Sequence, residues 1–261
     1  MKYGFIGCGN MGGAIARALS KTTNDIMISD RSGKANALAD ELQITYADTM
    51  SVATSCDRIF LAVKPQMMKD ALAPLQKYLR AYKPLLITMA AGLEISKIQE
   101  LAGAELPVIR IIPNTPVLVG KGMTLYCCND LVDESLLEDF LDDMAFTGHM
   151  DQIPEHLIDA AGVVSGCGPA YMYMFAEALA DGAVACGVPR GKALEYAAAT
   201  LIGAGEILLQ TGEHPGKLKD NVCSPGGSTI AGLNVLEQRA FRGAVMDCVK
   251  AAYKRNQELG K

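Results

Sequence analysis

The chain has 261 residues, of which 50% are hydrophobic and 20% are charged, as is typical of a globular protein with one large domain or two ordinary ones. The formal net charge is −5 and no block of basic residues occurs, which argues against the clustered Lys and Arg that bind nucleic-acid phosphates. Every apolar run is shorter than the roughly 18 residues of a membrane-spanning helix. We therefore expect neither a nucleic-acid nor a membrane partner.

Eight cysteines are scattered through apolar or glycine-rich stretches, and no secretory leader precedes the first expected strand. This pattern favours reduced thiols and a cytoplasmic location over a disulfide framework. No CxxC pair occurs, and the three histidines, His149, His156 and His214, lack the spacing of metal ligands. No metal site is predicted.

The first half of the chain alternates short apolar runs with helical patterns, which is typical of a parallel sheet with crossover helices. Strands are predicted at Tyr3–Ile6, Ile26–Ser29, Arg58–Val63, Leu85–Met89 and Val108–Ile112, with a further extended segment at Gly122–Cys127. Helices are predicted at Met11–Ser20, Lys34–Leu42, Met67–Leu79, Ser96–Leu101 and Glu134–Met144. These elements predict an α/β fold with a doubly wound sheet over residues 1–152.

Residues 153–261 are rich in alanine and glycine at helical spacing. Gly168-Pro169 predicts the first turn of a helix through Tyr171–Cys186, because proline is tolerated there. Gly187–Pro189 should end that helix. Further helices are predicted over Gly191–Gln210 and from Thr229 to the C-terminus. An all-helical domain with so many small and apolar residues is more easily buried in a dimer than alone.

A glycine-rich segment follows the first strand directly and opens a helix. Gly7 permits a tight turn, Gly9 lets the backbone approach a pyrophosphate, and Gly12 allows close packing of helix on strand. The helix N-terminus then faces the phosphate charge. With Asp30 at the end of the second strand, this context predicts a dinucleotide cofactor bound by Gly7, Cys8, Gly9, Asn10, Met11 and Gly12.

The end of the second strand bears on the choice between NAD and NADP. Asp30 can accept a hydrogen bond from the ribose 2′-hydroxyl, which favours NAD. Arg31 and Ser32 follow at once and can hold a 2′-phosphate through charge-assisted hydrogen bonds, which favours NADP. From these residues alone both cofactors remain open.

Three more strand ends carry small or rigid residues at the carboxyl edge, where ligands bind in such sheets. The residue before a proline is pushed to extended geometry, so Lys64 should project from its strand end, although a solvated lysine fits the pattern nearly as well. The cofactor-binding residues predicted at these ends are Ala62, Val63, Lys64, Pro65, Ala90, Ala91, Gly92 and Asn114.

The segment Leu218–Ile230 has a proline followed by two glycines, which predicts a tight loop before a helix. We expect Ser228 or Thr229 to cap that helix. The free N–H groups at the start of that helix can bind a carboxylate, with hydroxyls from Ser224 and Thr229 nearby. By local physics alone, a capped helix joined by a structural turn explains the segment better.

Several segments resemble pyrroline-5-carboxylate reductases, in the same order over essentially the whole chain. The most specific is Asp220–Thr229, DNVCSPGGST, which closely resembles the signature of that family. The others are Phe5–Gly12, Ala62–Pro65, Pro113–Pro116, Ser165–Tyr171 and Gly212–Gly216.

The resemblance implies a Rossmann-like N-terminal domain, followed by an all-helical domain that interlocks two subunits, with decamers as a possible larger assembly. It implies hydride transfer from NAD(P)H to the C=N carbon of pyrroline-5-carboxylate, which gives proline. The substrate-binding residues implied are Glu155, Asn221, Ser224, Gly227, Ser228 and Thr229, with Thr229 also the catalytic residue that reaches the ring nitrogen.

The family usually prefers NADPH, which favours Arg31 and Ser32 as phosphate ligands. Asp30 departs from the neutral residue often found there, so NADH stays an alternative cofactor. Thr49 stands where some relatives have a cofactor-contacting asparagine and is not in the predicted set.

Two other functions are weighed against this one. A β-hydroxyacid dehydrogenase would carry a catalytic lysine on a helix of the second domain, and Lys192, Lys217 and Lys219 do not lie in that motif. A non-catalytic cofactor-binding protein is disfavoured because the phosphate loop and the substrate loop are both intact.

Overall fold

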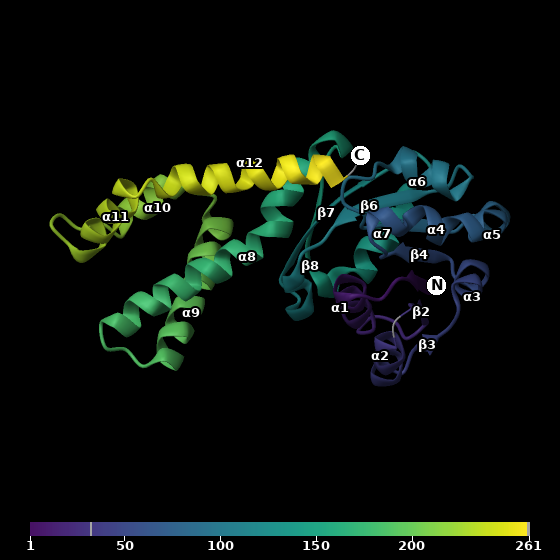
Figure 1. The fold of residues 1–261 in the computed structure, drawn as a ribbon, viewed down its shortest axis with the longest axis horizontal. Helices are drawn as coiled ribbons and strands as arrows, with labels where there is room; N and C mark the ends of the chain where they lie inside the picture. The colour runs from purple at the N-terminus through teal and green to yellow at the C-terminus, as the bar shows by residue number, and fades with distance from the viewer. Residues whose placement is uncertain (32, 260–261) are drawn as a thin grey trace. The chain divides into compact units, whose positions relative to one another are not determined.

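The computed structural model describes residues 1–31 and 33–259, apart from the side chains of Lys34 and Leu259. It has two compact units (Figure 1). Unit 1 comprises Met1–Cys167 and Ala252–Lys261, and unit 2 comprises Gly168–Ala251. The helices α8 (Glu155–Ala185) and α12 (Phe241–Leu259) each contribute residues to both units.

Unit 1 is built on a sheet with the strand order β3-β2-β1-β4-β5-β6-β7-β8. The strands are β1 Tyr3–Ile6, β2 Ile26–Ser29, β3 Thr45–Tyr46, β4 Arg58–Leu61, β5 Leu85–Thr88, β6 Val108–Ile112, β7 Gly122–Cys128 and β8 Gly148–Gln152. All neighbouring pairs are parallel except β6 and β7. The order reverses between β1 and β4, so their carboxyl ends form the crevice where such sheets bind ligands.

Helices cover both faces of the sheet and bury an apolar core against each. One core contains Phe5, Phe60 and Phe140 and is closed by α1 (Asn10–Leu19), α2 (Lys34–Leu42) and α7 (Glu134–Asp143). The other contains Ile59, Ile98 and Ile158. It is closed by α3 (Thr49–Ser55), α4 (Met68–Leu72), α5 (Gln76–Tyr82), α6 (Ile95–Ala102) and the first turns of α8. This three-layer arrangement confirms the predicted fold class.

The predicted strands all form, but one predicted helix does not form as a single piece. In place of a helix over Met67–Leu79, α4 and α5 are separated by the 3-10 helix Ala73–Leu75, and another 3-10 helix, Pro65–Met67, precedes α4. Pro74 has no N–H to bond the preceding turn, which explains the break. The remaining 3-10 helices are Thr115–Val119 and Ala145–Thr147.

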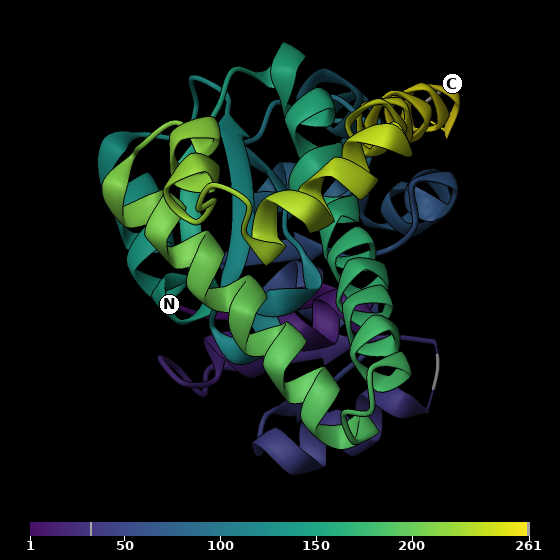
Figure 2. The same cartoon turned by 90° about the vertical axis from the view of Figure 1, so that its left-hand side faces the viewer.

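Unit 2 consists of parts of α8 and α12 together with α9 (Arg190–Thr211), α10 (Pro215–Asn221) and α11 (Ser228–Gln238). Figure 2 shows α8 and α9 in green as two long helices that meet at a short turn low in the view. This turn contains Gly187, where the predicted break between the helices is confirmed.

The prediction that a helix begins at Gly168-Pro169 is wrong, because α8 starts at Glu155 and runs through Pro169. Proline cannot donate to the carbonyl four residues earlier, which here belongs to Ser165. That carbonyl accepts a hydrogen bond from Asn114 Nδ2 at 3.0 Å instead, and Asn114 Oδ1 accepts from the N–H of Met123 at 2.9 Å. A side chain from a distant loop thus satisfies the carbonyl and allows the helix to continue.

Unit 2 has almost no buried core within the chain. Only three of its residues are buried, Ala180, Ala193 and Ala197. Large apolar side chains are exposed along its helices, among them Met174 at 75%, Ile202 at 71% and Leu209 at 82%. So much exposed apolar surface is typical of a protein–protein interface.

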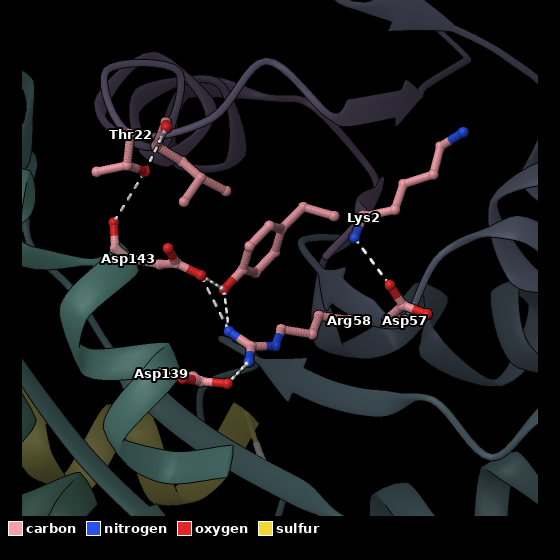
Figure 3. A network of polar contacts seen from close by, with 8 residues as sticks. Lys2, Thr22, Asp57, Arg58, Asp139 and Asp143 are labelled. Atoms are coloured by element: carbon pink, nitrogen blue, oxygen red, sulfur yellow. Dashed lines mark hydrogen bonds and ion pairs between the residues drawn. The ribbon is translucent and has the colours of Figure 1, made fainter. Parts of the chain in front are cut away.

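A buried arginine, Arg58, anchors α7 to the starts of β1 and β4 (Figure 3). Its guanidinium lies 3.0 Å from Asp143 and 3.1 Å from Asp139, one helical turn apart on α7. It also donates to the Tyr3 hydroxyl, which in turn donates to Asp143, both at 2.6 Å. Burial, and then the bond to Asp143, raise the pKa of Tyr3 above its usual range.

We expect Asp143→Ala to lower the free energy of unfolding by about 2 kcal/mol, because it deprives a buried guanidinium and a buried phenol of their shared acceptor. Asp142→Ala, at the neighbouring exposed position of α7, should change it by less than about 0.5 kcal/mol. Urea unfolding followed by circular dichroism at one protein concentration compares the two. Equal midpoints would show that the network does not stabilise unit 1.

Candidate active site

The glycine-rich turn joins β1 to α1 at the switch point of the sheet. Gly7 has φ +94°, and its N–H donates to Ser29 O at 2.8 Å. A Cβ on Gly7 would lie 2.8 Å from the backbone of Ala62, and one on Gly12 would lie 2.8 Å from Gly7 O. Only glycine fits these two positions, because the turn is packed between β4 and α1.

Gly9 is different, because a Cβ there would meet no atom of the chain within 4 Å. Gly9 is the N-cap of α1, and no side chain caps this helix. The N–H groups of the first turn, which includes Asn10 and Met11, therefore have no partner within the helix. An anion such as a pyrophosphate fits this position.

Cys8 and Asp30 connect the turn to the end of β2. The N–H of Cys8 donates to Asp30 Oδ2 at 2.6 Å. The Cys8 thiol is buried in the core, and burial raises its pKa to about 11. The N–H of Cys8 is therefore already engaged, and the Asp30 carboxylate holds the glycine turn in place.

A hollow of about 400 Å³ lies beside the turn at the end of β2. Of the predicted residues, Gly7, Asp30, Arg31 and Val63 line it. Ser32 lies outside the described residues. The sequence analysis missed several lining residues from α3, the strand before it and the α4 region: Tyr46, Ala47, Asp48, Thr49, Met67, Asp70, Ala71 and Pro74.

Charge in this hollow is mostly negative. Asp30, Asp48 and Asp70 line it together with Arg31. The N–H of Ser51 donates to Asp48 and holds the pKa of that carboxyl below its usual range. The Arg31 guanidinium is thus the lining group suited to a phosphate.

The predicted residues after β4 lie at the same edge. Ala62 N donates to Ile6 O at 2.9 Å, which holds the strand end beside the glycine turn. Lys64 is exposed and extended, with ψ 148°, as expected of a residue before proline. Pro65 then begins a 3-10 helix.

The loop after β5 carries Ala90, Ala91 and Gly92, with Gly92 at φ +74°. Gly92 N donates to Asp159 Oδ1 at 3.4 Å, and Ile95 N donates to Glu155 Oε1 at 2.7 Å. Glu155, predicted to contact the substrate, thus has its carboxylate at the N-terminus of α6. Asn114, predicted to contact the cofactor, makes the hydrogen bonds to Ser165 and Met123 described above.

The predicted substrate residues other than Glu155 gather in unit 2 around the loop between α10 and α11. Asn221 ends α10, and Gly227 N donates to Ser224 O at 3.0 Å, which closes the turn. Gly226 has φ +68°. A Cβ on Gly227 would lie 2.4 Å from Ser224 Oγ, so a larger residue there would displace the Ser224 hydroxyl.

The expected hydroxyl cap of α11 is not made. Gly227 is the N-cap, no side chain caps the helix, and Ser228 and Thr229 are its first two residues. Both are exposed within the chain. Their hydroxyls and the N–H groups of the first turn are therefore available to an anion. By contrast, His214 Nδ1 caps α10 by accepting from Gly216 N at 3.0 Å.

Comparison with known proteins decides between the functions considered. Residues 155–259 match the family model described as pyrroline-5-carboxylate reductase dimerisation, and residues 2–92 match the one described as NADP oxidoreductase, coenzyme F420-dependent. The pyrroline-5-carboxylate reductases of Synechocystis sp. and Escherichia coli are 41% and 39% identical to the chain, over 100% of its length and 99% and 98% of theirs. The chain belongs to the pyrroline-5-carboxylate reductase family.

Solved structures agree with this assignment to the pyrroline-5-carboxylate reductase family. The crystal structure of Plasmodium falciparum pyrroline carboxylate reductase with NADP bound has a TM-score of 0.91 and 34% identity, covering 100% of this chain and 98% of that one. The reductase from Streptococcus pyogenes has a TM-score of 0.90 and 32% identity, covering 99% and 98%. The resemblance found in the sequence is confirmed, and a dimerisation domain is present in the helical half.

Among the described residues, no group of three or more His, Cys, Asp or Glu is placed to hold a metal ion. In the same part of the chain, no helix has both the length and the apolar character that crossing a membrane requires.

Proposed function

We propose that the protein reduces pyrroline-5-carboxylate to proline with NADPH as the hydride donor. The observation that carries the proposal is the uncapped start of α11, directly after the closed Ser224–Gly227 turn, in the segment that most specifically resembles the family. Full-length relatives at 41% and 39% identity carry this name, and a solved relative holds NADP.

The chain's own residues would act by binding and orientation. The N–H groups at the start of α11 and the Ser224 and Ser228 hydroxyls hold the substrate carboxylate. Asn221 and Glu155 complete the predicted substrate set. The Thr229 hydroxyl orients the ring nitrogen and relays its proton. When bound, a reduced nicotinamide supplies the hydride that the imine carbon accepts.

The cofactor would lie along the carboxyl edge of the sheet. The segment from Gly7 to Gly12, which includes the start of α1, holds the pyrophosphate, and Arg31 with Ser32 holds the 2′-phosphate. The strand ends Ala62–Pro65 and Ala90–Gly92, with Asn114, complete the predicted contacts. Preorganised positioning in such a site accounts for catalysis without a nucleophilic side chain.

The direct test is the rate of NADPH and NADH oxidation by purified protein with pyrroline-5-carboxylate, followed by detection of proline. Formation of proline with stoichiometric NADPH oxidation is expected. Folded protein that binds NADPH but oxidises neither cofactor would overturn the proposal and direct attention to other imines and hydroxy acids.

The cofactor preference should depend on the opposed charges at residues 30 and 31. We expect Arg31→Ala to lower kcat/KM for NADPH by about tenfold or more, the worth of one charge-assisted hydrogen bond, and to leave NADH nearly unchanged. Asp30→Asn, which keeps an acceptor for Cys8 N but removes a negative charge, should favour NADPH further. Steady-state kinetics with both cofactors measure the ratio. An Arg31→Ala enzyme that loses both cofactors equally would show that Arg31 does not contact the 2′-phosphate.

The proposal includes two domains, residues 1–152 and 153–261. It also includes a homodimer formed through the C-terminal helices, with a decamer as a larger assembly. The proposed location is the cytoplasm. The match of residues 155–259 to a dimerisation model and the exposed apolar side chains of unit 2 support the dimer. All eight cysteines are free, which suits a reducing compartment.

A further inference from the structure

Arg110, in the middle of β6, is 1% exposed and carries a full charge on the face of the sheet covered by α6 and α8. Two carboxylates of α8 neutralise it. Asp159 Oδ1 lies 2.6 Å from its guanidinium, and Glu155 Oε1 lies 3.5 Å away. The two acids are four residues apart, so they lie on one side of the helix, one turn apart.

The same two carboxylates accept hydrogen bonds from within the loop between β5 and α6 and from the first residue of α6. Asp159 Oδ1 accepts from Gly92 N, and Glu155 Oε1 accepts from Ile95 N, the first N–H of α6. The residue before α6, Glu94, makes no side-chain cap, so Glu155 takes over that task from another element. Asn256 Nδ2, near the end of α12, adds a bond to Asp159 at 3.2 Å.

Two parts of the loop are packed: Ala90 is buried in the core and Leu93 packs against it. Gly92 is different, because it borders a cavity. A hollow of about 420 Å³, lined in part by Gly92, Glu94 and the Arg110 cluster, occupies the space where side chains would otherwise pack. Where the loop borders this hollow, at Gly92 and Glu94, its position depends on the hydrogen bonds to Asp159 and Glu155. The bonds to Glu155 and Asp159 in turn depend on Arg110, because unpaired carboxylates beside an apolar core are costly.

We propose that Asp159 is a positioning residue that holds the Ala90–Gly92 loop in place for cofactor binding. It acts together with Glu155, and both carboxylates are held by their pairing with Arg110. The inference rests on the proposed function, in which this loop contacts the cofactor. A displacement of about 1 Å in such a loop weakens binding and turnover although no ligand contact is removed.

The chain contains a matched control for this arrangement. Arg58 is also 1% exposed and is paired with two acids four residues apart on one helix, Asp139 and Asp143. That cluster lies on the opposite face of the sheet and at the starts of the strands. Its guanidinium contacts Tyr3, Asp139 and Asp143, which are not among the predicted cofactor residues. Loss of an acid there tests the general cost of breaking a buried ion pair.

The experiment compares Asp159→Ala with Asp143→Ala in the full-length protein. The readouts are the thermal midpoint, the Kd for NADPH from its fluorescence on binding, and kcat. We expect both variants to lower the midpoint. Asp159→Ala alone should raise the Kd for NADPH by about tenfold or more, with a fall in kcat. Asp159→Asn, which keeps an acceptor for Gly92 N, should fold well and fall between the wild type and Asp159→Ala.

Two results would overturn the inference. In the first, folded Asp159→Ala has the same Kd for NADPH and the same kcat as the wild type. If Asp159→Ala does not fold, the same result in Asp159→Asn counts instead. The other is an equal rise of Kd in Asp143→Ala, which would mean that general loosening is the cause. The Kd for NADPH is measured without substrate, so the test of Asp159 does not depend on the identity of the substrate. If the wild-type protein binds NADPH but makes no proline, the proposed substrate is refuted, and the Kd values still show whether Asp159 affects cofactor binding.

Discussion

Replacing Gly9 by alanine is expected to weaken NADPH binding about 100-fold while leaving the fold intact. A Cβ at this position meets no atom of the chain within 4 Å, so the unliganded protein has room for it. The methyl group would instead occupy the space in front of the first turn of α1, where the pyrophosphate approaches the backbone. Loss of one or two charge-assisted hydrogen bonds, each worth about 1.5–3 kcal/mol, gives this magnitude.

Two neighbouring glycines provide the controls. Gly13→Ala places its Cβ at an ordinary 3.4 Å from Leu38, inside α1, and should bind NADPH normally. Gly7→Ala should destabilise the protein itself, because its φ is +94° and its Cβ would lie 2.8 Å from Ala62. Titration of NADPH fluorescence and thermal melts separate the three effects. Unchanged NADPH affinity in Gly9→Ala would place the pyrophosphate elsewhere.

Thr229→Ala is expected to lower kcat about 100-fold, the effect of removing one group that assists proton transfer or charge stabilisation in a transition state. Thr229 is the second residue of α11 and is exposed within the chain, so its hydroxyl contributes little to the stability of unit 2. The thermal midpoint should therefore stay close to that of the wild type.

Two replacements at the same position identify the hydroxyl as the cause. Thr229→Val keeps the shape of the side chain without the hydroxyl and should be as slow as Thr229→Ala. Thr229→Ser keeps the hydroxyl and should recover most of the activity. Steady-state kinetics with pyrroline-5-carboxylate give the comparison. Wild-type turnover in a well-folded Thr229→Ala would remove Thr229 from the mechanism.

The central strands were predictable because each is a short, fully buried apolar run between helical patterns. The edge strands were not. β3 is two exposed residues, and β8, with the sequence GHMDQ, is half exposed and polar. Both owe their extended form to pairing with a neighbour distant in sequence, as β8 does with β7. The antiparallel pairing of β6 and β7 has the same origin.

The start of α8 shows how a local rule fails when a distant residue compensates. Pro169 normally marks a first turn, because it leaves a carbonyl without a donor. Asn114 supplies that donor to Ser165 from 51 residues earlier in the chain. No pattern near Pro169 could indicate this bond, since it depends on the packing of the loop after β6 against α8.

The geometry of the glycine turn was predictable because its residues are contiguous in sequence; that it binds a cofactor stays a prediction. The turn from Gly7 to Gly12 carries its own geometry, and the structure explains the glycines at both ends. Bonds between distant elements were missed. Glu155 was assigned to the substrate from resemblance alone, and its bonds to Ile95 and Arg110 were visible only in the fold. Whether it also contacts the substrate stays a prediction.

Because so few residues of unit 2 are buried, we expect the stability of this unit to depend on protein concentration. Only Ala180, Ala193 and Ala197 are buried in the single chain, so in the proposed homodimer these helices would obtain most of their stabilising burial from association. The substrate loop before α11 belongs to this unit, so its order should vary with protein concentration. A newly made chain would then acquire a complete substrate site only when it meets a second chain, which makes assembly itself the final step of maturation.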